Sequence, residues 1–275
     1  VLPAKAKTRL FANTTKGSRA LNQPLDWHLE SVSKQAGEWV RRIGRLNGFS
    51  GLSQLTRDTL AEPTDHPDFL WQNDAVATVA GISDDYAGRL IFNMAGTGAG
   101  KTITNLKLAQ AATPPGRPCR VSIALNLRSL TLQTAESIQK LGFLEASEIA
   151  CLIGDSFSLA MSKADNEDED NDETPPGDLE MAGYGVGEGP EWLDPWAKKQ
   201  KHPARVRQFL STPCLVSTVD YLTQAGEPGR QGHHVKAALR VVSSDLILDE
   251  VDNYDSKALV AICRVIMMSA LFNRN

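Results

Sequence analysis

From about residue 90 onward, short apolar runs alternate with segments that carry the periodicity of helices. The runs that we expect to form strands are Leu90–Met94, Arg120–Leu125, Ile149–Ile153, Pro213–Val219 and Val241–Asp249. The segments that we expect to form helices are Lys101–Ala112, Ser129–Leu141, a short one near Tyr221, and Ser256–Phe272. Strands that alternate with helices predict parallel βαβ units with right-handed crossovers. The pattern therefore predicts an α/β fold in which helices cover both faces of a parallel sheet.

Two stretches depart from this pattern. Residues 1–65 contain one amphipathic helix candidate, Leu29–Leu46, and three arginines lie on its polar side: Arg41, Arg42 and Arg45. Residues 155–200 combine a run of acids with a Pro- and Gly-rich tract, which is typical of a long surface insertion. We therefore predict a mostly helical N-terminal segment over 1–65 and a domain over 66–275 with a disordered acidic insertion at about 155–200. The insertion is either a solvated, variable loop or an acidic gate or partner contact.

The composition is that of a soluble globular protein. The chain has 275 residues, of which 41% are hydrophobic and 23% charged, and this excludes a wholly disordered, collagen-like or disulfide-stapled chain. The formal net charge of −4 is unevenly spread, because residues 165–180 hold nine acids and no Lys or Arg. The rest of the chain is net positive, and residues 1–60 carry ten Lys or Arg against four acids. The overall charge therefore does not argue against a nucleic-acid partner.

The cysteines and the apolar runs bear on the cellular compartment. Four scattered cysteines without a CxxC pair predict reduced, buried thiols rather than a zinc site: Cys119, Cys151, Cys214 and Cys263. No apolar run approaches the roughly 20 residues of a membrane span, and there is no signal-peptide core. We therefore expect a cytoplasmic protein with no membrane partner. The chain opens on Val1 rather than Met, which we interpret as processing or as a piece cut from something longer.

The sharpest motif is the glycine-rich stretch Ala95–Thr102, which follows a strand candidate and opens a helix. In a phosphate-binding loop, glycines let backbone N–H groups turn toward phosphate oxygens. Lys101 would reach the β- and γ-phosphates of ATP, and Thr102 would place its hydroxyl on Mg²⁺. The strict pattern has Gly where Ala95 stands, and Ala suits helicase-type loops. The candidate nucleotide-binding residues are Thr97, Gly98, Ala99, Gly100, Lys101 and Thr102. The alternative is a glycine-rich turn with an incidental lysine.

A second acidic motif follows the apolar run Leu246–Leu248. Asp249 would hold Mg²⁺, commonly through water, and Glu250 would position or deprotonate the attacking water. Asp252 completes the pattern. Taken alone, such acids are also typical of a solvated strand end, and it is the phosphate loop that makes them a candidate metal site. Together with Lys101, we predict Asp249 and Glu250 as the catalytic residues.

Weaker motifs suggest contacts with nucleic acid and with the base of ATP. Arg128 starts a helix after a strand and could bind a phosphate, or it is a surface arginine. Ser217 and Thr218 lie at a strand-to-helix junction and either contact a nucleic-acid backbone or cap the helix. Gln72, 26 residues before Gly98, could read the adenine edge, or it belongs to an isolated Trp-Gln dipeptide. For the histidines we expect solvated or capping roles: His28, His66, His202, His233 and His234.

Together these residues resemble the motifs of superfamily-two helicases. Motif I is matched by Ala95–Thr102, motif Ia by Arg128–Gln133, a later DNA-contact motif by Ser217–Leu222, and the DExD motif II by Asp249–Asp252. Within that superfamily the chain resembles the type I-F branch of the CRISPR-associated helicase–nucleases. The stretches that carry this resemblance are Phe92–Met94, Ser122–Thr134 and Leu239–Glu250. It covers about residues 68–275, and residues 1–65 resemble the segment that joins the nuclease and helicase parts in that family.

The resemblance implies the first RecA-like domain of a larger protein, with ATP and Mg²⁺ as cofactors. Its implied partners are single-stranded DNA, an RNA-guided CRISPR surveillance complex, a second RecA-like domain and an HD nuclease domain. In that family ATP drives 3′-to-5′ movement on the displaced DNA strand. The departures are absences: there is no His-Asp dipeptide for a nuclease centre, and Leu271 stands where motif III would have Thr after Ser269-Ala270.

We also find no motifs IV to VI, whose arginine finger would speed hydrolysis. We therefore expect the chain alone to bind Mg–ATP weakly and not to unwind DNA. The alternative function is a standalone or degenerate nucleotide-dependent nucleic-acid-binding module. A nucleotide kinase is disfavoured because the motifs lie in helicase order.

Overall fold

The computed structural model of the chain describes residues 10–14, 20–43, 48–82, 89–153, 188–198, 203–226 and 233–272. The chain divides into two compact units, Val1–Leu46 and Asn47–Asn275.

The first unit consists of a small β-ladder followed by a long helix. Strand β1 (Phe11–Asn13) pairs antiparallel with β2 (Gln23–Pro24), and helix α1 (Leu25–Ile43) begins directly after β2. The predicted N-terminal helix is thus confirmed, although it begins at Leu25 rather than Leu29. Asp26 lies in its first turn, where a carboxylate stabilises the positive end of the helix dipole. Arg45 lies outside the described residues.

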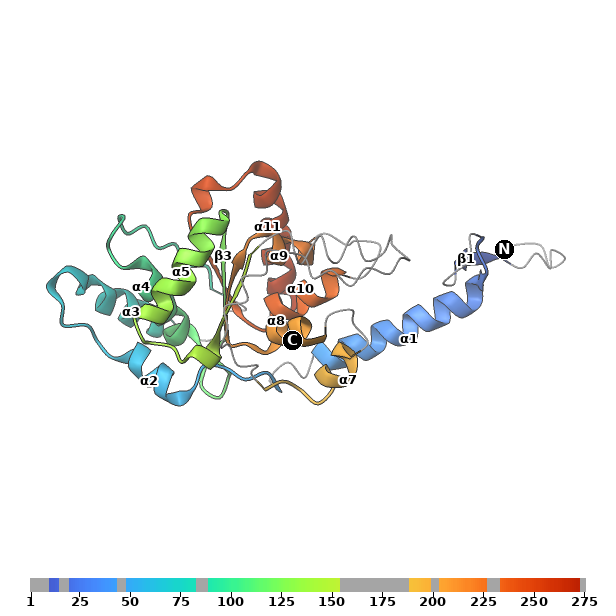
Figure 1. The fold of residues 1–275 in the computed structure, drawn as a ribbon, viewed down its shortest axis with the longest axis horizontal. Coiled ribbons are helices and arrows are strands. Elements are labelled where there is room, and N and C mark those ends of the chain that lie inside the picture. Colours follow the sequence, from blue (N-terminus) through green and yellow to red (C-terminus); the bar gives the residue numbers. More distant parts are fainter. Residues whose placement is uncertain are drawn as a thin grey trace, which may run out of the picture. The chain divides into compact units, whose positions relative to one another are not determined.

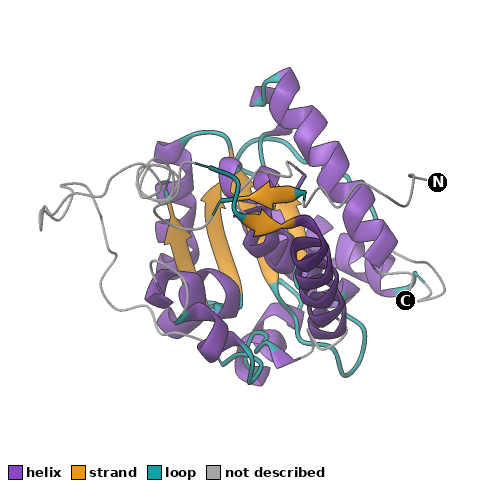
Figure 2. Cartoon of the chain, turned by 90° about the vertical axis from the view of Figure 1, so that its right-hand side faces the viewer, coloured by secondary structure: helices purple, strands orange, loops and turns teal. Residues whose placement is uncertain are grey.

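The second unit contains a four-stranded sheet in the order β4-β5-β3-β6. Its strands are β3 (Val121–Leu125), β4 (Ile149–Leu152), β5 (Cys214–Thr218) and β6 (Asp245–Leu248). Every neighbouring pair is parallel, and β3 and β5 are buried along their whole length, as strands covered on both faces must be. The strands form the centre of the unit, with helices around them (Figure 2). The predicted α/β fold with a RecA-like parallel sheet is confirmed.

Helices lie on both sides of this sheet (Figure 1). On one side are α3 (Trp71–Ala80), α4 (Lys101–Ala112) and α5 (Arg128–Lys140), and on the other are α8 (Pro203–Ser211), α9 (Asp220–Thr223), α10 (His233–Val242) and α11 (Ser256–Phe272). The predicted bounds of α4 and α11 are reproduced residue for residue. Gly142, with φ 67°, follows the carboxyl end of α5 as predicted. The main core cluster includes Leu106, Val121, Ile123, Ile138 and Val216.

Residues 48–62, which the sequence analysis assigned to the N-terminal segment, belong to the second unit. Leu52 and Leu60, the latter on helix α2 (Gln54–Ala61), are part of the main core cluster. The carboxylate of Glu148, in the 3-10 helix η3 (Ala146–Glu148), accepts hydrogen bonds from Ser53 N and Thr56 Oγ1, both at 2.5 Å. Burial of apolar side chains and this carboxylate thus attach α2 to the core, so the unit begins well before the predicted boundary at residue 65.

The predicted strand Leu90–Met94 is wrong. Residues 89–96 form no strand, and the side chains of Leu90, Phe92 and Met94 are 69%, 79% and 92% exposed. Strand β6 ends the sheet on this side, and it pairs only with β3 among the described residues. A strand needs a ladder of backbone hydrogen bonds to a neighbour, and none of the described strands pairs with this run, so it lies outside the sheet.

The predicted acidic insertion is described only in part. Residues 154–187 lie outside the described residues, whereas residues 188–198 fold against the core. Ser50 N donates to Glu188 O at 3.1 Å, and the rings of Phe49 and Trp192 meet edge to face at 6.0 Å. Leu193, in α7 (Leu193–Ala197), is 1% exposed. The disordered stretch predicted up to residue 200 is therefore wrong for residues 188–198, because Leu193 and Ala197 are buried and Trp192 packs against Phe49.

Two buried arginines fix the carboxyl end of α8. The guanidinium of Arg240 donates to Phe209 O, Thr212 O and Pro213 O, at 3.4, 2.5 and 3.2 Å. That of Arg120 donates to Leu210 O at 2.5 Å and also to Ser211 O and Ser50 O. Burial lowers the pKa of both groups, that of Arg240 to about 9. The last carbonyl groups of a helix lack the N–H donors that a further turn would supply. The two guanidinium groups supply these hydrogen bonds instead.

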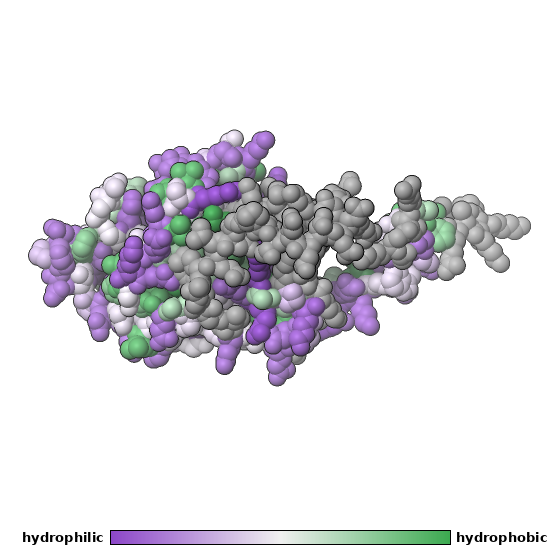
Figure 3. Space-filling model, in the orientation of Figure 1, coloured by the Kyte–Doolittle hydropathy of each residue, from purple (hydrophilic) through white to green (hydrophobic). Residues whose placement is uncertain are grey.

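Polar and charged side chains predominate on the face drawn in Figure 3, with apolar ones scattered between them. None of the described helices combines the length and the apolar character needed to cross a lipid bilayer. All four thiols are free, but only Cys119 and Cys214 are fully buried; Cys151 is half-buried and Cys263 is exposed on α11. The prediction of buried thiols is therefore wrong for Cys263, because this position of the helix lies away from the core.

Candidate nucleotide-binding site

The glycine-rich loop is a tight turn that leads directly into α4. Gly98 and Gly100 adopt left-handed conformations, with φ 80° and 77°. Ala99 N donates to Gly96 O, Gly100 is the N-cap of α4, and Lys101 and Thr102 are the first two residues of the helix. A β-carbon added at Gly96 or Gly98 would meet no atom within 4 Å, so the space beside the loop is open. The free N–H groups of a helix start beside an open loop suit a bound phosphate.

An asparagine that the sequence analysis did not single out attaches this loop to α4. Asn93 Oδ1 accepts from Ala95 N at 3.2 Å, and Asn93 Nδ2 donates to Asn105 Oδ1, in α4, at 2.9 Å. The entry to the loop and the helix that follows it are therefore held together by one side chain. An Asn two residues before a turn is a common signal for this kind of side-chain contact.

The predicted adenine-reading residue lies against the loop. Gln72 is 4% exposed, and a β-carbon added at Gly100 would lie 2.8 Å from Gln72 Nε2. The same β-carbon would lie 3.3 Å from ring atoms of Phe69, whose ring centroid is 4.9 Å from that of His66. The structure thus brings Gln72 to the loop and adds Phe69 and His66 beside it. The sequence spacing between Gln72 and Gly98 did not indicate that Phe69 and His66 would lie beside the loop.

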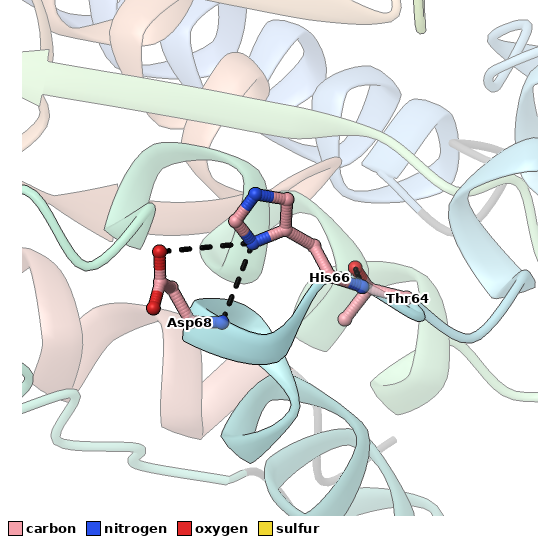
Figure 4. Close-up of polar contacts among 3 residues, drawn as sticks. All are labelled: Thr64, His66 and Asp68. Carbon is pink, nitrogen blue, oxygen red and sulfur yellow. Dashed lines mark hydrogen bonds and ion pairs between the residues drawn. The ribbon is translucent and has the colours of Figure 1, made fainter.

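A short polar turn fixes the start of the helix that carries Gln72. His66 Nδ1 accepts from Asp68 N at 3.3 Å and lies 3.9 Å from Asp68 Oδ2, while His66 N donates to Thr64 Oγ1 at 3.3 Å (Figure 4). Thr64 and Asn73 exchange two hydrogen bonds of 2.9 and 2.8 Å. His66 thus caps η2 (Pro67–Phe69), which confirms the capping role expected for it. These contacts orient the first turn of α3.

The two candidate acids follow β6. Asp249 N donates to Ala124 O at 3.0 Å and so continues the ladder with β3 for one residue. Glu250 then adopts a left-handed conformation, φ 52° and ψ 46°, and its N–H donates to Asp249 Oδ1 at 3.1 Å. Asp249 is half-buried and Glu250 exposed. Both carboxylates therefore lie at the carboxyl end of the strands, the edge at which open α/β sheets bind ligands.

The direction of α4 brings the loop to that same edge. Arg89 Nη1 donates to the carbonyl of Ala112, the last residue of α4, at 3.0 Å. Partial removal from water raises the pKa of Asp245, the first residue of β6, to about 6, and the nearby Arg89 acts in the opposite direction. The carboxyl end of α4 is thus near the amino end of β6. Since the helix has 12 residues, or about 18 Å, its amino end and the loop extend toward the opposite edge.

A buried tyrosine donates a hydrogen bond to the same carbonyl that accepts from the backbone of Asp249. Tyr254 is 6% exposed, and its hydroxyl donates to Ala124 O at 2.8 Å. Burial, and then the carboxylates of Asp249 and Glu250, raise the pKa of Tyr254. One carbonyl of β3 therefore receives both the backbone of Asp249 and the side chain of Tyr254. No motif in the sequence pointed to this residue, because a tyrosine six positions after the end of a strand carries no signal of its own.

The predicted nucleic-acid contacts differ in their exposure. Arg128 is exposed at the first residue of α5. Ser217 and Thr218 are 0% and 2% exposed within β5, and their hydroxyl oxygens have no hydrogen-bond partner among the described residues. They do not cap α9, whose N-cap is Val219, so the capping alternative is wrong. Contact with nucleic acid stays a prediction for all three residues, and for Ser217 and Thr218 it requires that the side chains covering them move.

Comparison with known proteins found two curated relatives, whereas no family model matches the chain. The CRISPR-associated nuclease/helicase Cas3 subtype I-F/YPEST of Pseudomonas aeruginosa is 32% identical over 276 residues, which cover 96% of this chain and 25% of the relative. The protein of the same name from Pectobacterium atrosepticum is 29% identical over 271 residues, covering 94% and 24%. The chain thus spans about a quarter of the length of the curated relatives that it matches. The resemblance inferred from the motifs is confirmed.

Proposed function

From this similarity to the type I-F CRISPR-associated helicase–nucleases, we propose that the chain is the ATP-binding first motor domain of such an enzyme. In that role it binds Mg–ATP, and hydrolysis of the nucleotide is coupled to movement along single-stranded DNA. The domain works in the cytoplasm.

One observation carries the proposal: the left-handed glycines lead straight into Lys101 and Thr102 at the start of α4, which extends toward the strand edge that bears Asp249 and Glu250. Lys101 neutralises the β- and γ-phosphates, and the exposed N–H groups of the helix start bind their oxygens. The Thr102 hydroxyl and the Asp249 carboxylate are hard oxygen ligands, which Mg²⁺ prefers. Glu250 orients the attacking water, and Gln72 reads the adenine edge.

Charge stabilisation limits what the chain does alone. Related nucleotide hydrolases gain about 10³- to 10⁵-fold in rate from an arginine supplied across the cleft. Neither a second RecA-like domain nor an HD nuclease centre is recognisable in this sequence. We therefore propose that these two domains of a full-length protein, together with an RNA-guided CRISPR surveillance complex, are its working partners, and that the chain by itself binds ATP weakly without unwinding DNA.

The second candidate is a nucleotide-dependent nucleic-acid-binding module that regulates rather than drives movement. A motor needs successive DNA contacts along its track, and Ser217 and Thr218 are buried, whereas the exposed Arg128 is one contact that suits binding without movement. The two candidates differ in whether single-stranded DNA accelerates ATP hydrolysis.

The test measures binding of a fluorescent ATP analogue with Mg²⁺ to the wild-type chain, to Lys101→Ala and to Lys140→Ala. Lys140 is a matched control, because its side chain is 78% exposed and its ion pair lies on the surface of α5. We expect at least about tenfold weaker binding for Lys101→Ala, the loss of one charge-assisted phosphate contact, and no change for Lys140→Ala. Equal binding by all three proteins would refute the nucleotide site. Strand separation by the chain alone would refute its proposed dependence on partners.

A further inference from the structure

Glu250 has an unusual backbone conformation that a glutamate residue does not favour. It is the one non-glycine residue with positive φ in the described part of the chain. A left-handed conformation costs an L-residue free energy, and it persists where neighbouring contacts impose it. The residue proposed to orient the attacking water is therefore held in place by its surroundings.

Asn253 makes two of the contacts that hold it. Asn253 N donates to Glu250 O at 2.9 Å and closes η5 (Val251–Asn253), and Asn253 Nδ2 donates to Glu250 Oε2 at 3.2 Å. The first bond fixes the backbone and the second fixes the carboxylate. An asparagine side chain can donate to a carboxylate only through its amide nitrogen, so this hydrogen bond sets the orientation of the Asn253 amide.

Asn126 attaches Asn253 to the central sheet. Asn126 Nδ2 donates to Asn253 O at 2.5 Å, across 127 positions of sequence. Asn126 directly follows β3 and stands two residues before Arg128, the first residue of α5. Two hydrogen bonds thus connect the start of α5 with the Glu250 carboxylate through one intermediate residue.

We propose that Asn253 is a positioning residue for Glu250, and that Asn126 holds Asn253 so that the start of α5 and the carboxylate move together. The proposal rests on the proposed function, since it assigns the hydrolytic water to Glu250. When a bound phosphate backbone displaces Arg128, Asn126 moves with it. Because Asn126 holds Asn253, this movement changes the orientation of the Glu250 carboxylate. This supplies a physical route by which nucleic acid alters ATP hydrolysis.

The first test needs no nucleotide. The shift in the urea midpoint of unfolding caused by Asn253→Ala is measured in the wild-type and in the Glu250→Ala background. We expect the smaller shift in the Glu250→Ala background, where the partner of the amide is already gone. Equal shifts in both backgrounds would overturn the proposed contact. Val251→Ala, in the same turn, is the matched control and should shift both backgrounds equally.

The second test measures single-turnover ATP hydrolysis with Mg²⁺ and single-stranded DNA. We expect Asn253→Ala to lower kcat about tenfold or more with unchanged affinity for the ATP analogue, because only the orientation of the water is lost. Asn126→Ala should lower kcat in the wild type but not in the Asn253→Ala background.

The outcomes separate the two proposals. A wild-type chain that neither binds nor hydrolyses ATP would refute the proposed function, whatever the unfolding cycle gives. A wild-type chain that hydrolyses ATP, with Asn253→Ala at the same kcat, would overturn the positioning role alone. Additive effects of Asn126→Ala and Asn253→Ala on kcat would overturn the link through Asn126.

Discussion

Gly100 and Gln72 lie in close contact: a β-carbon added at position 100 would lie 2.8 Å from Gln72 Nε2, so the end of the Gln72 side chain would have to shift. The φ of 77° favours glycine at this position, and the close approach of Gln72 adds a second reason for the absence of a side chain. The glycine-rich loop and helix α3 are thus in close contact at Gly100 and Gln72.

Gly116 offers a matched control for this contact, because its φ is 78° and an added β-carbon there would meet nothing within 4 Å. Gly116→Ala should therefore cost only the backbone strain, about 1–2 kcal/mol of unfolding free energy. Gly100→Ala should cost about 1 kcal/mol more and also weaken ATP binding, because Gln72 and Phe69 must move. Urea unfolding and analogue binding of both variants check this. Equal losses would show that Gln72 yields without cost.

Arg240→Lys should destabilise the second unit strongly. An ammonium group cannot reach the carbonyls of Phe209, Thr212 and Pro213 together, as the planar guanidinium does. At least one buried carbonyl then lacks a donor, and we expect a loss of about 2–4 kcal/mol in unfolding free energy. Arg117→Lys, at an exposed position, is the control and should change it by less than about 0.5 kcal/mol. A small effect of Arg240→Lys would mean that water replaces the lost donors.

The thiols should differ in their reaction with an aromatic disulfide reagent at pH 8. Burial raises the pKa of Cys119, Cys151 and Cys214, the last two to about 12, so few thiolates form in the folded chain. Cys263 is exposed and should react at once, while the other three react only as the protein unfolds. Counting the released chromophore with and without denaturant checks this. Prompt reaction of a second thiol would contradict the burial of the sheet.

Much of the fold follows from periodicity in the sequence. The bounds of α4 and α11 were predicted because both are long segments without Gly or Pro, and β3 and β5 because continuous apolar runs mark strands buried on both faces. The phosphate loop needed only local spacing. The same criterion failed at Leu90–Met94, since an apolar run shows that a segment can form a strand and not that it has a neighbour.

What the sequence did not predict depends on contacts between distant residues. The run Val241–Asp249 was predicted as one strand, yet Val241 and Val242 end α10 and β6 begins only at Asp245. Two valines suit either element, and the packing of Arg240 beneath α8 decides between them. In the same way, the pairing of Asn126 with Asn253 requires two separate strand ends to meet, and no local pattern reports this.

The hydrogen bond from Ser50 to Glu188 has a consequence for the length of the chain between β4 and α7. From Glu188 onward the chain is held to the core by contacts of its own, so its position there does not depend on the length of the connection. Doubling such a connection costs only about 0.6 kcal/mol of closure entropy. Because residues 188–198 are attached to the core by their own contacts, we expect a fluorescent reporter attached at the exposed Glu188 side chain to leave the glycine-rich loop of the nucleotide site undisturbed.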